Sequence, residues 1–233
     1  MPLSTIAFDA DDTLWENEHI FQLTEQRFRD LLTNHADIDQ LSDNLLEMER
    51  RNLRYYGYGI KGFTLSMIET AIEATGGQIP ATILQEILNA GREMHEHPVD
   101  PLPHVETTLK KLSGDFRLIV ITKGDLFDQE RKLAQSGLGD FFDGVEVVSE
   151  KMTDTYQRIF DQYGDGPARS MMIGNSLKSD IRPAIEAGSW GVYIPYKLTW
   201  ANEAADEPGG HAKYRQLSHM GELPELLENI LNS

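Results

Sequence analysis

The stretch Leu3-Ser-Thr-Ile-Ala-Phe-Asp-Ala-Asp-Asp-Thr-Leu-Trp15 decides the fold. Its first six residues form a short β-prone run, which ends abruptly at the acidic residues Asp9, Asp11 and Asp12. Comparable apolar runs recur at residues 116–121, 144–148, 170–173 and 190–194. Nearly continuous apolar runs between polar loops are typical of strands that are buried on both faces of a parallel sheet.

Helical patterns separate the later apolar runs. They cover residues 127–136, 153–163 and 179–187, and each is followed by a glycine, a residue that commonly ends a helix. This alternation of strands and helices predicts an α/β fold with a doubly wound, Rossmann-like core built on a parallel sheet.

Residues 18–97 interrupt the alternation with helical patterns alone. These patterns lie at residues 20–34, 41–56, 63–75 and 80–96. The segment Pro98-Val-Asp-Pro-Leu-Pro103 is suited to a stiff return linker, because proline restricts both itself and the residue before it. We therefore expect an α/β core formed by residues 1–17 and 98–233, with an inserted α-helical cap domain at residues 18–97.

Composition excludes several classes of function. The chain has 233 residues and no cysteine, which rules out disulfides, thiolate zinc sites and a cysteine nucleophile. Its formal net charge of −17 argues against nucleic acid or an anionic membrane as a partner. We expect a cytoplasmic protein, since the sequence has no apolar segment near membrane-spanning length and no basic, signal-like start. Nothing in the sequence indicates the oligomeric state.

Residues able to do chemistry follow four of the expected strands. Because parallel strands end at the same edge of a sheet, we expect these residues to lie close together. Each has an ordinary explanation when taken alone, such as an aspartate or threonine that caps a helix or strand, or a solvated lysine. The four groups are Asp9 with Asp11, Thr122-Lys-Gly124, Lys151, and Gly174-Asn-Ser-Leu-Lys-Ser-Asp180.

The residue types in these groups suit phosphate chemistry. Of two carboxylates two positions apart, one can attack while the other carries a proton, provided that a cation limits their repulsion. Mg²⁺ prefers oxygen ligands and would supply that charge. A hydroxyl and main-chain N–H groups at a strand end, as at Thr122, can hold a phosphate without adding charge.

The full set Asp9-x-Asp11-x-Thr13, Thr122, Lys151 and Gly174-Asn-x4-Asp180 resembles the four motifs of the haloacid dehalogenase-like (HAD) hydrolase superfamily. The resemblance covers residues 3–196. The helical insert lies where members of that superfamily carry a C1-type cap.

The resemblance implies a Mg²⁺-dependent phosphatase that acts on a small phosphorylated metabolite. Asp9 would be the nucleophile and form an aspartyl-phosphate, and Asp11 would be the general acid and then the general base. Lys151 would bind the phosphoryl group and restrain Asp9, and Thr122 and Lys123 would also bind substrate.

The same resemblance assigns the magnesium ligands to Asp9, the main-chain oxygen of Asp11, Asn175 and Asp180. Two residues depart from the common pattern, because many members have glycine at the position of Asp12 and aspartate at that of Asn175. An amide brings no charge, so we expect weaker metal affinity. Asp12 either offsets that loss or caps the following segment.

Alternative functions remain open from the sequence. A phosphomutase and a 2-haloacid dehalogenase share the fold, and a non-catalytic phosphate-binding module would explain Asn175. In the insert, Lys61 within Tyr55-Tyr-Gly-Tyr-Gly-Ile-Lys-Gly-Phe63 is a candidate substrate-binding cation, although a helix–helix turn with aromatic packing explains that segment equally well.

Overall fold

The computed structural model describes residues 3–198, 200–203 and 205–232. The chain divides into two compact units. One comprises residues 1–18, 99–123 and 130–233, and the other comprises residues 19–98 and 124–129. We call them the α/β unit and the helical unit.

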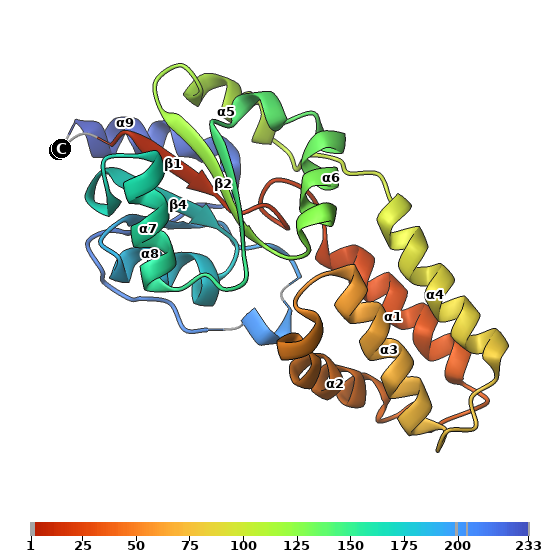
Figure 1. Cartoon of the computed structure of the whole chain (residues 1–233). Coiled ribbons are helices and arrows are strands. Elements are labelled where there is room, and N and C mark those ends of the chain that lie inside the picture. Colours follow the sequence, from red (N-terminus) through yellow and green to blue (C-terminus); the bar gives the residue numbers. More distant parts are fainter. Residues whose placement is uncertain (1–2, 199, 204, 233) are drawn as a thin grey trace. The chain divides into compact units, whose positions relative to one another are not determined.

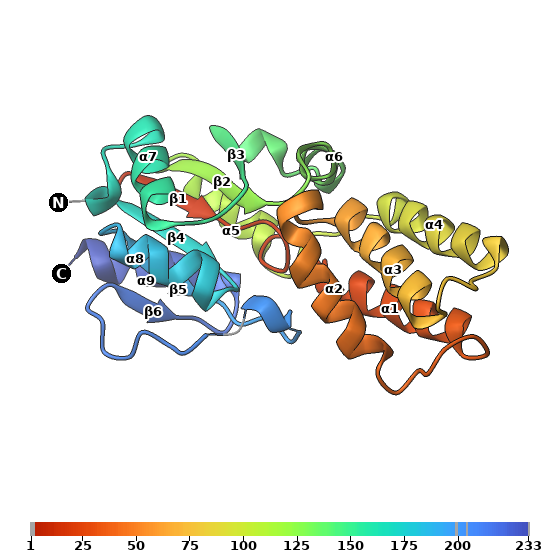
Figure 2. The ribbon, with the colours of Figure 1, turned by 60° about the horizontal axis from the view of Figure 1, so that its bottom comes forward.

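The α/β unit is built on one sheet of six parallel strands. Their order across the sheet is β3-β2-β1-β4-β5-β6, which Figure 2 shows from β3 at the top to β6 at the bottom. The predicted parallel-sheet α/β fold is confirmed, and β6 is an addition to it. The strands are β1 (Thr5–Phe8), β2 (Arg117–Lys123), β3 (Gly144–Val148), β4 (Ser170–Gly174), β5 (Trp190–Tyr193) and β6 (Tyr214–Gln216).

Helices cover both faces of this sheet, with α5 and α9 on one side and α7 and α8 on the other (Figure 1). Where the sequence pattern predicts one helix over residues 179–187, the structure has a π-helical turn, η3 (Leu177–Ile181), followed by a short α8. The α-helices that follow residue 98 are α5 (Val105–Leu112), α6 (Leu126–Ser136), α7 (Thr153–Tyr163), α8 (Arg182–Glu186) and α9 (Leu223–Leu231).

The two faces of the sheet explain why Ile6, Ala7 and Phe8 of β1 are all apolar. Ile6 and Phe8 are buried in the cluster that includes α5 and α9, whereas Ala7 is buried in the cluster that includes α7. Because side chains alternate across a strand, a strand at the centre of a two-sided core presents apolar residues to both faces.

The helical unit contains four helices that are consecutive in the sequence. Its core holds Phe28, Leu45, Met67 and Ile87, one from each helix. Residues 124–129, which follow β2 and enter α6, group with this unit. The four helices are α1 (Glu18–Leu32), α2 (Leu41–Tyr56), α3 (Ile60–Ala74) and α4 (Ala81–Glu96).

Within the described part of the chain, every helix is too short or too polar to cross a lipid bilayer.

Gly91 is a close-packing position between α3 and α4. A Cβ atom there would lie 2.3 Å from the hydroxyl oxygen of Thr64 and 3.2 Å from its Cβ. We expect Gly91→Ala to destabilise the protein by about 1–2 kcal/mol in urea unfolding, because overpacking costs more than the gain in helix propensity. Thr64→Ala should relieve the defect in the double variant. Gly114→Ala is the control, because a Cβ atom there meets nothing within 4 Å. An unchanged stability of Gly91→Ala would contradict this account of the packing.

Candidate active site

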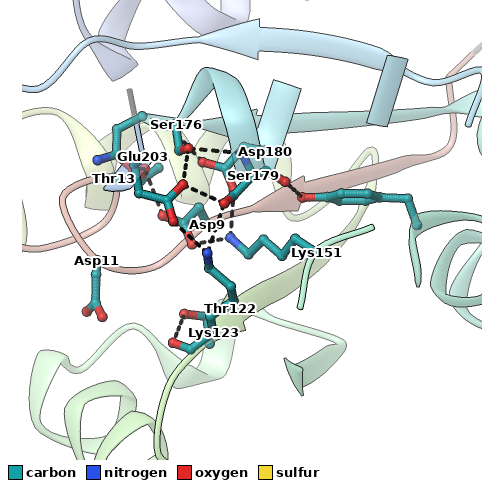
Figure 3. Close-up of polar contacts among 12 residues, drawn as sticks. Asp9, Asp11, Thr13, Thr122, Lys123, Lys151, Ser176, Ser179, Asp180 and Glu203 are labelled. Atoms are coloured by element: carbon teal, nitrogen blue, oxygen red, sulfur yellow. Dashed lines mark hydrogen bonds and ion pairs between the residues drawn. The ribbon is translucent and has the colours of Figure 1, made fainter. Parts of the chain in front are cut away.

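The ends of parallel strands gather the polar residues of the candidate site. Asp9 directly follows β1, and its main-chain N–H donates to Ile173 in β4 at 2.8 Å. Thr122 and Lys123 end β2, and Asn175 directly follows β4. Figure 3 shows the side chains of Asp9, Thr122 and Lys123 close together at the ends of their strands.

Lys151 is the centre of a buried ion cluster. Its ammonium donates to Oδ1 of Asp9 and, at 2.6 Å, to Oδ1 of Asp180. The side chain of Lys151 is 2% exposed and that of Asp180 is 1% exposed. Removing one member of such a cluster would leave a buried charge without compensation, which typically costs several kcal/mol.

The carboxylates outnumber the cation in this cluster, and the pKa values reflect that imbalance. The pKa of Asp9 is raised to about 7, because burial and the charges of Asp180 and Asp11 raise it more than Lys151 lowers it. Burial lowers the pKa of Lys151, but Asp180 and Asp9 more than reverse the effect, so its pKa is raised. A second cation beside Asp9 would bring the carboxylate back to its ionised form at neutral pH.

The oxygens that would receive such a cation converge on Asn175. Its amide oxygen accepts from the Thr13 hydroxyl at 3.2 Å. Turned over, its amide nitrogen would donate to Oδ2 of Asp9 at 3.1 Å and to the main-chain oxygen of Asp11 at 3.3 Å. In either orientation, Asp9 Oδ2, the main-chain oxygen of Asp11 and the Thr13 hydroxyl surround one end of the Asn175 side chain, and oxygens of these kinds are the ligands that Mg²⁺ prefers. Among the described residues no three acidic, histidine or cysteine side chains gather around a metal position, so most of this donor set is neutral.

Asp180 has a different environment from the other three predicted metal ligands. Its Oδ1 accepts from Lys151, and its Oδ2 accepts from the main-chain N–H of Ser176 at 2.9 Å. A Cβ atom on Gly174 would lie 2.2 Å from that Oδ2. Glycine at position 174 is therefore required for Asp180 to reach both donors.

The Asp11 carboxylate is directed away from Asp9 (Figure 3). Its Oδ1 accepts from the indole N–H of Trp15 at 2.8 Å and from the ammonium of Lys132 at 2.5 Å. Lys132 lies in α6, and its side chain is 8% exposed. The sequence offers no signal for this lysine, because a helical lysine ordinarily faces solvent.

Thr122 and Lys123 lie beside the ion cluster. The Thr122 hydroxyl is buried and donates to the main-chain oxygen of Lys123 at 3.2 Å. The Lys123 ammonium binds Glu203 Oε1 at 2.6 Å and Ser179 Oγ at 2.9 Å. Glu203 belongs to the short helical turn η4 (Ala201–Glu203), in a segment that reads as a polar loop in the sequence.

Lys61, the remaining candidate, belongs to the helical unit. Its ammonium lies 2.9 Å from both carboxylate oxygens of Asp125, and its side chain is about half exposed. Burial raises the pKa of Asp125, but the ion pair with Lys61 and a main-chain hydrogen bond from Asp128 outweigh burial, so the pKa is lowered. A substrate anion would compete with Asp125 for Lys61, and the role of Lys61 in substrate binding stays a prediction.

Asp12 is explained by its backbone and its hydrogen bonds. Its φ of 59° lies in the left-handed region, which glycine, asparagine and aspartate tolerate best. Its carboxylate accepts from the main-chain N–H groups of Asn17 at 2.8 Å and Glu18 at 3.1 Å, where α1 begins. Of the two roles considered for Asp12, the structure therefore supports capping.

The model of the haloacid dehalogenase-like hydrolases matches residues 3–188, which include Asp9, Thr122, Lys151 and Asp180. The chain belongs to this family. The resemblance seen in the four motifs is thereby confirmed at the level of the superfamily.

Individual relatives are similar over most of the chain. The glyceraldehyde 3-phosphate phosphatase of Methanothermobacter thermautotrophicus is 26% identical over 89% of this chain and 92% of its own length. The pyrimidine 5′-nucleotidase YjjG of Escherichia coli is 30% identical over 64% of each chain. The crystal structure of a HAD-like family hydrolase from Xanthomonas campestris is 40% identical, with a TM-score of 0.88, over 99% of this chain and 92% of that one.

Substitutions at Asp12 separate its cap from its backbone conformation. Asp12→Ala should lower the free energy of unfolding in urea by about 2 kcal/mol, because it removes a helix cap and places alanine at positive φ. Asp12→Gly should lower that free energy by only about 1 kcal/mol, because it also removes the cap but glycine tolerates positive φ. Asp12→Asn should stay near wild type, since its amide oxygen still accepts. Equal losses in the alanine and glycine variants would mean that the backbone at Asp12 is unstrained.

Proposed function

We propose that the protein is a Mg²⁺-dependent phosphatase that hydrolyses a small phosphomonoester through an aspartyl-phosphate on Asp9. The observation that carries the proposal is the Asp9–Lys151–Asp180 cluster beside Thr122, at the edge where ligands of α/β sheets bind. The phosphatase and nucleotidase named among its relatives support this reaction class.

In the first step a carboxylate oxygen of Asp9 attacks the phosphorus atom, and the bond between phosphorus and the leaving oxygen breaks. Lys151 holds the attacking carboxylate in place, and its positive charge offsets the negative charge of the phosphoryl group. Lys151 and Thr122 both bind the phosphoryl oxygens. Asp11 gives its proton to the leaving oxygen. Because the Asp11 carboxylate is turned toward Lys132 and Trp15, this transfer requires the side chain to rotate.

In the second step a water molecule attacks the phosphorus atom of the aspartyl-phosphate. Asp11, now ionised, takes a proton from that water, and the bond between phosphorus and Asp9 breaks. Inorganic phosphate leaves, and both carboxyl groups return to their starting protonation states.

Asp9, the main-chain oxygen of Asp11 and Asn175 are the residues that would hold Mg²⁺, with Asp180 acting mainly on Lys151. When bound, the ion supplies positive charge that lowers the pKa of Asp9 and offsets the charge of the phosphoryl group. Asn175 contributes an oxygen without charge, so the ion is expected to bind less tightly than with an aspartate at this position.

Asp9→Asn tests the nucleophile. We expect turnover of a panel of phosphomonoesters to fall by at least about 10³-fold, since the amide is a poor nucleophile for phosphorus. Asp140→Asn, which removes an exposed carboxylate, is the matched control and should keep wild-type activity. Turnover that survives Asp9→Asn would refute the assignment. If no ester is turned over while phosphate still binds, the protein is a binding module.

Asn175→Asp tests the metal site independently of activity. Without metal, the added charge beside Asp9 should lower the melting temperature, and Mg²⁺ should then raise it more than in wild type. We expect about tenfold tighter Mg²⁺ binding, or about 1.4 kcal/mol. Asn34→Asp adds the same charge at an exposed position. It should change neither the melting temperature without metal nor the response to Mg²⁺. A Mg²⁺ response equal to that of wild type would exclude Asn175 from the site.

A 2-haloacid dehalogenase is the second candidate, because that branch of the superfamily needs neither the metal nor the acid at the position of Asp11. Two observations favour it: the mostly neutral donor set and the Asp11 carboxylate turned toward Lys132. Release of halide from 2-chloropropionate in the presence of EDTA would establish it. Phosphoester turnover that EDTA abolishes and Mg²⁺ restores would exclude it.

A further inference from the structure

We infer that Lys123, Ser176 and Ser179 form a second anion-binding subsite, which takes a carboxylate of the substrate, and that the Glu203 carboxylate holds this subsite when the substrate is away. The inference rests on the proposed function and narrows it, since the preferred substrate would be a phosphomonoester of a carboxylic acid.

The Glu203 carboxylate sits in a cage of three donors. Its Oε1 accepts from the Lys123 ammonium at 2.6 Å. Its Oε2 accepts from the hydroxyls of Ser176 and Ser179. Figure 3 shows this carboxylate and its donors beside Asp9 and Lys151. The protein therefore already binds a carboxylate next to the candidate nucleophile.

The balance of forces in the cage favours an ionised carboxylate. Burial raises the pKa of Glu203, but Lys123 and the two seryl hydroxyls together lower it below its ordinary value. The donors therefore outweigh the cost of removing a carboxylate from water. A substrate carboxylate in the same place would gain the same interactions.

The donors are tied to one another, so the cage does not depend on Glu203 for its shape. Lys123 donates to the Ser179 hydroxyl at 2.9 Å, and the Ser179 main-chain N–H donates to the Ser176 hydroxyl at 3.0 Å. Preorganised donors bind an anion with little further ordering.

The cage is adjacent in sequence to residues of the candidate site. Lys123 directly follows Thr122, and Ser179 directly precedes Asp180, which binds Lys151. A small molecule whose phosphoryl group reaches Asp9 can therefore place a nearby carboxylate in the cage.

The segment that carries Glu203 is a long connection between two strands. It joins β5 to β6 over residues 194–213, and of its described residues only η4 is helical. Loops this long in a compact domain are commonly functional. When a substrate carboxylate displaces the Glu203 side chain, Lys123 stays paired and the hydrogen bonds from the seryl hydroxyls are kept. The Glu203 carboxylate is then solvated.

Binding of two matched probes tests the inference without turnover. Phosphonoacetate carries a phosphonate and a carboxylate, and ethylphosphonate has a methyl group in place of the carboxylate. By calorimetry with Mg²⁺ present, wild type should bind phosphonoacetate at least about fivefold more tightly. Glu203→Gln should widen that ratio severalfold, because a neutral amide competes less for the cage. Lys123→Met and the double variant Ser176→Ala/Ser179→Ala should each reduce the ratio of the two affinities to below twofold.

Glu207→Gln is the matched control, because it removes one exposed charge from the same segment and should leave the ratio unchanged. Equal binding of the two probes by wild type, or a Glu203→Gln variant that loses the preference for phosphonoacetate, would overturn the inference. Glu203 would then serve only to stabilise the structure of its segment. Failure of the proposed function looks different: neither phosphoglycolate nor ethyl phosphate is hydrolysed, while the preference for phosphonoacetate persists.

Discussion

One buried ammonium, that of Lys151, holds the candidate site together. It joins Asp9, at the end of the central strand, to Asp180, in the π-helical turn that follows β4. Two carboxylates at this depth would repel each other without it. The same cation therefore orients the candidate nucleophile and helps to position the turn that carries Ser179, and in the proposed reaction it would provide charge for the phosphoryl group.

The charges around Asp9 support the proposal that a cation from outside the chain binds beside it. Asp9 keeps a raised pKa even beside Lys151, because burial and Asp180 act in the other direction. The side chain of Asn175 lies where the remaining oxygens converge and adds no charge of its own. Lys132 and Lys123 are both engaged by carboxylates, those of Asp11 and Glu203. These two cations are therefore committed to other carboxylates, and the candidate nucleophile Asp9 stays short of positive charge.

The sequence alone predicts most of the sheet and only part of the site. Continuous apolar runs identify five strands, and their ends explain why Asp9, Thr122 and Lys151 lie at one edge. Strand β6 has three residues and no apolar run, so periodicity cannot reveal it. Lys132 and Glu203 are equally hidden, because a lysine in a helix and a glutamate in a polar loop look solvated until tertiary contacts bury them. The choice between two roles for Asp12 needed its φ and its hydrogen bonds.

The order of strands also has a consequence for how the chain folds. β1 leaves the ribosome first, yet it pairs with β2 and β4, which begin at residues 117 and 170. Until both are synthesised, β1 lacks at least one of its two neighbours, and the lysine that pairs with Asp9 lies 142 positions further along the chain. Long-range parallel pairing of this kind is slow and leaves strand edges exposed. Nascent chains that stop before β4 therefore leave one edge of β1 unpaired.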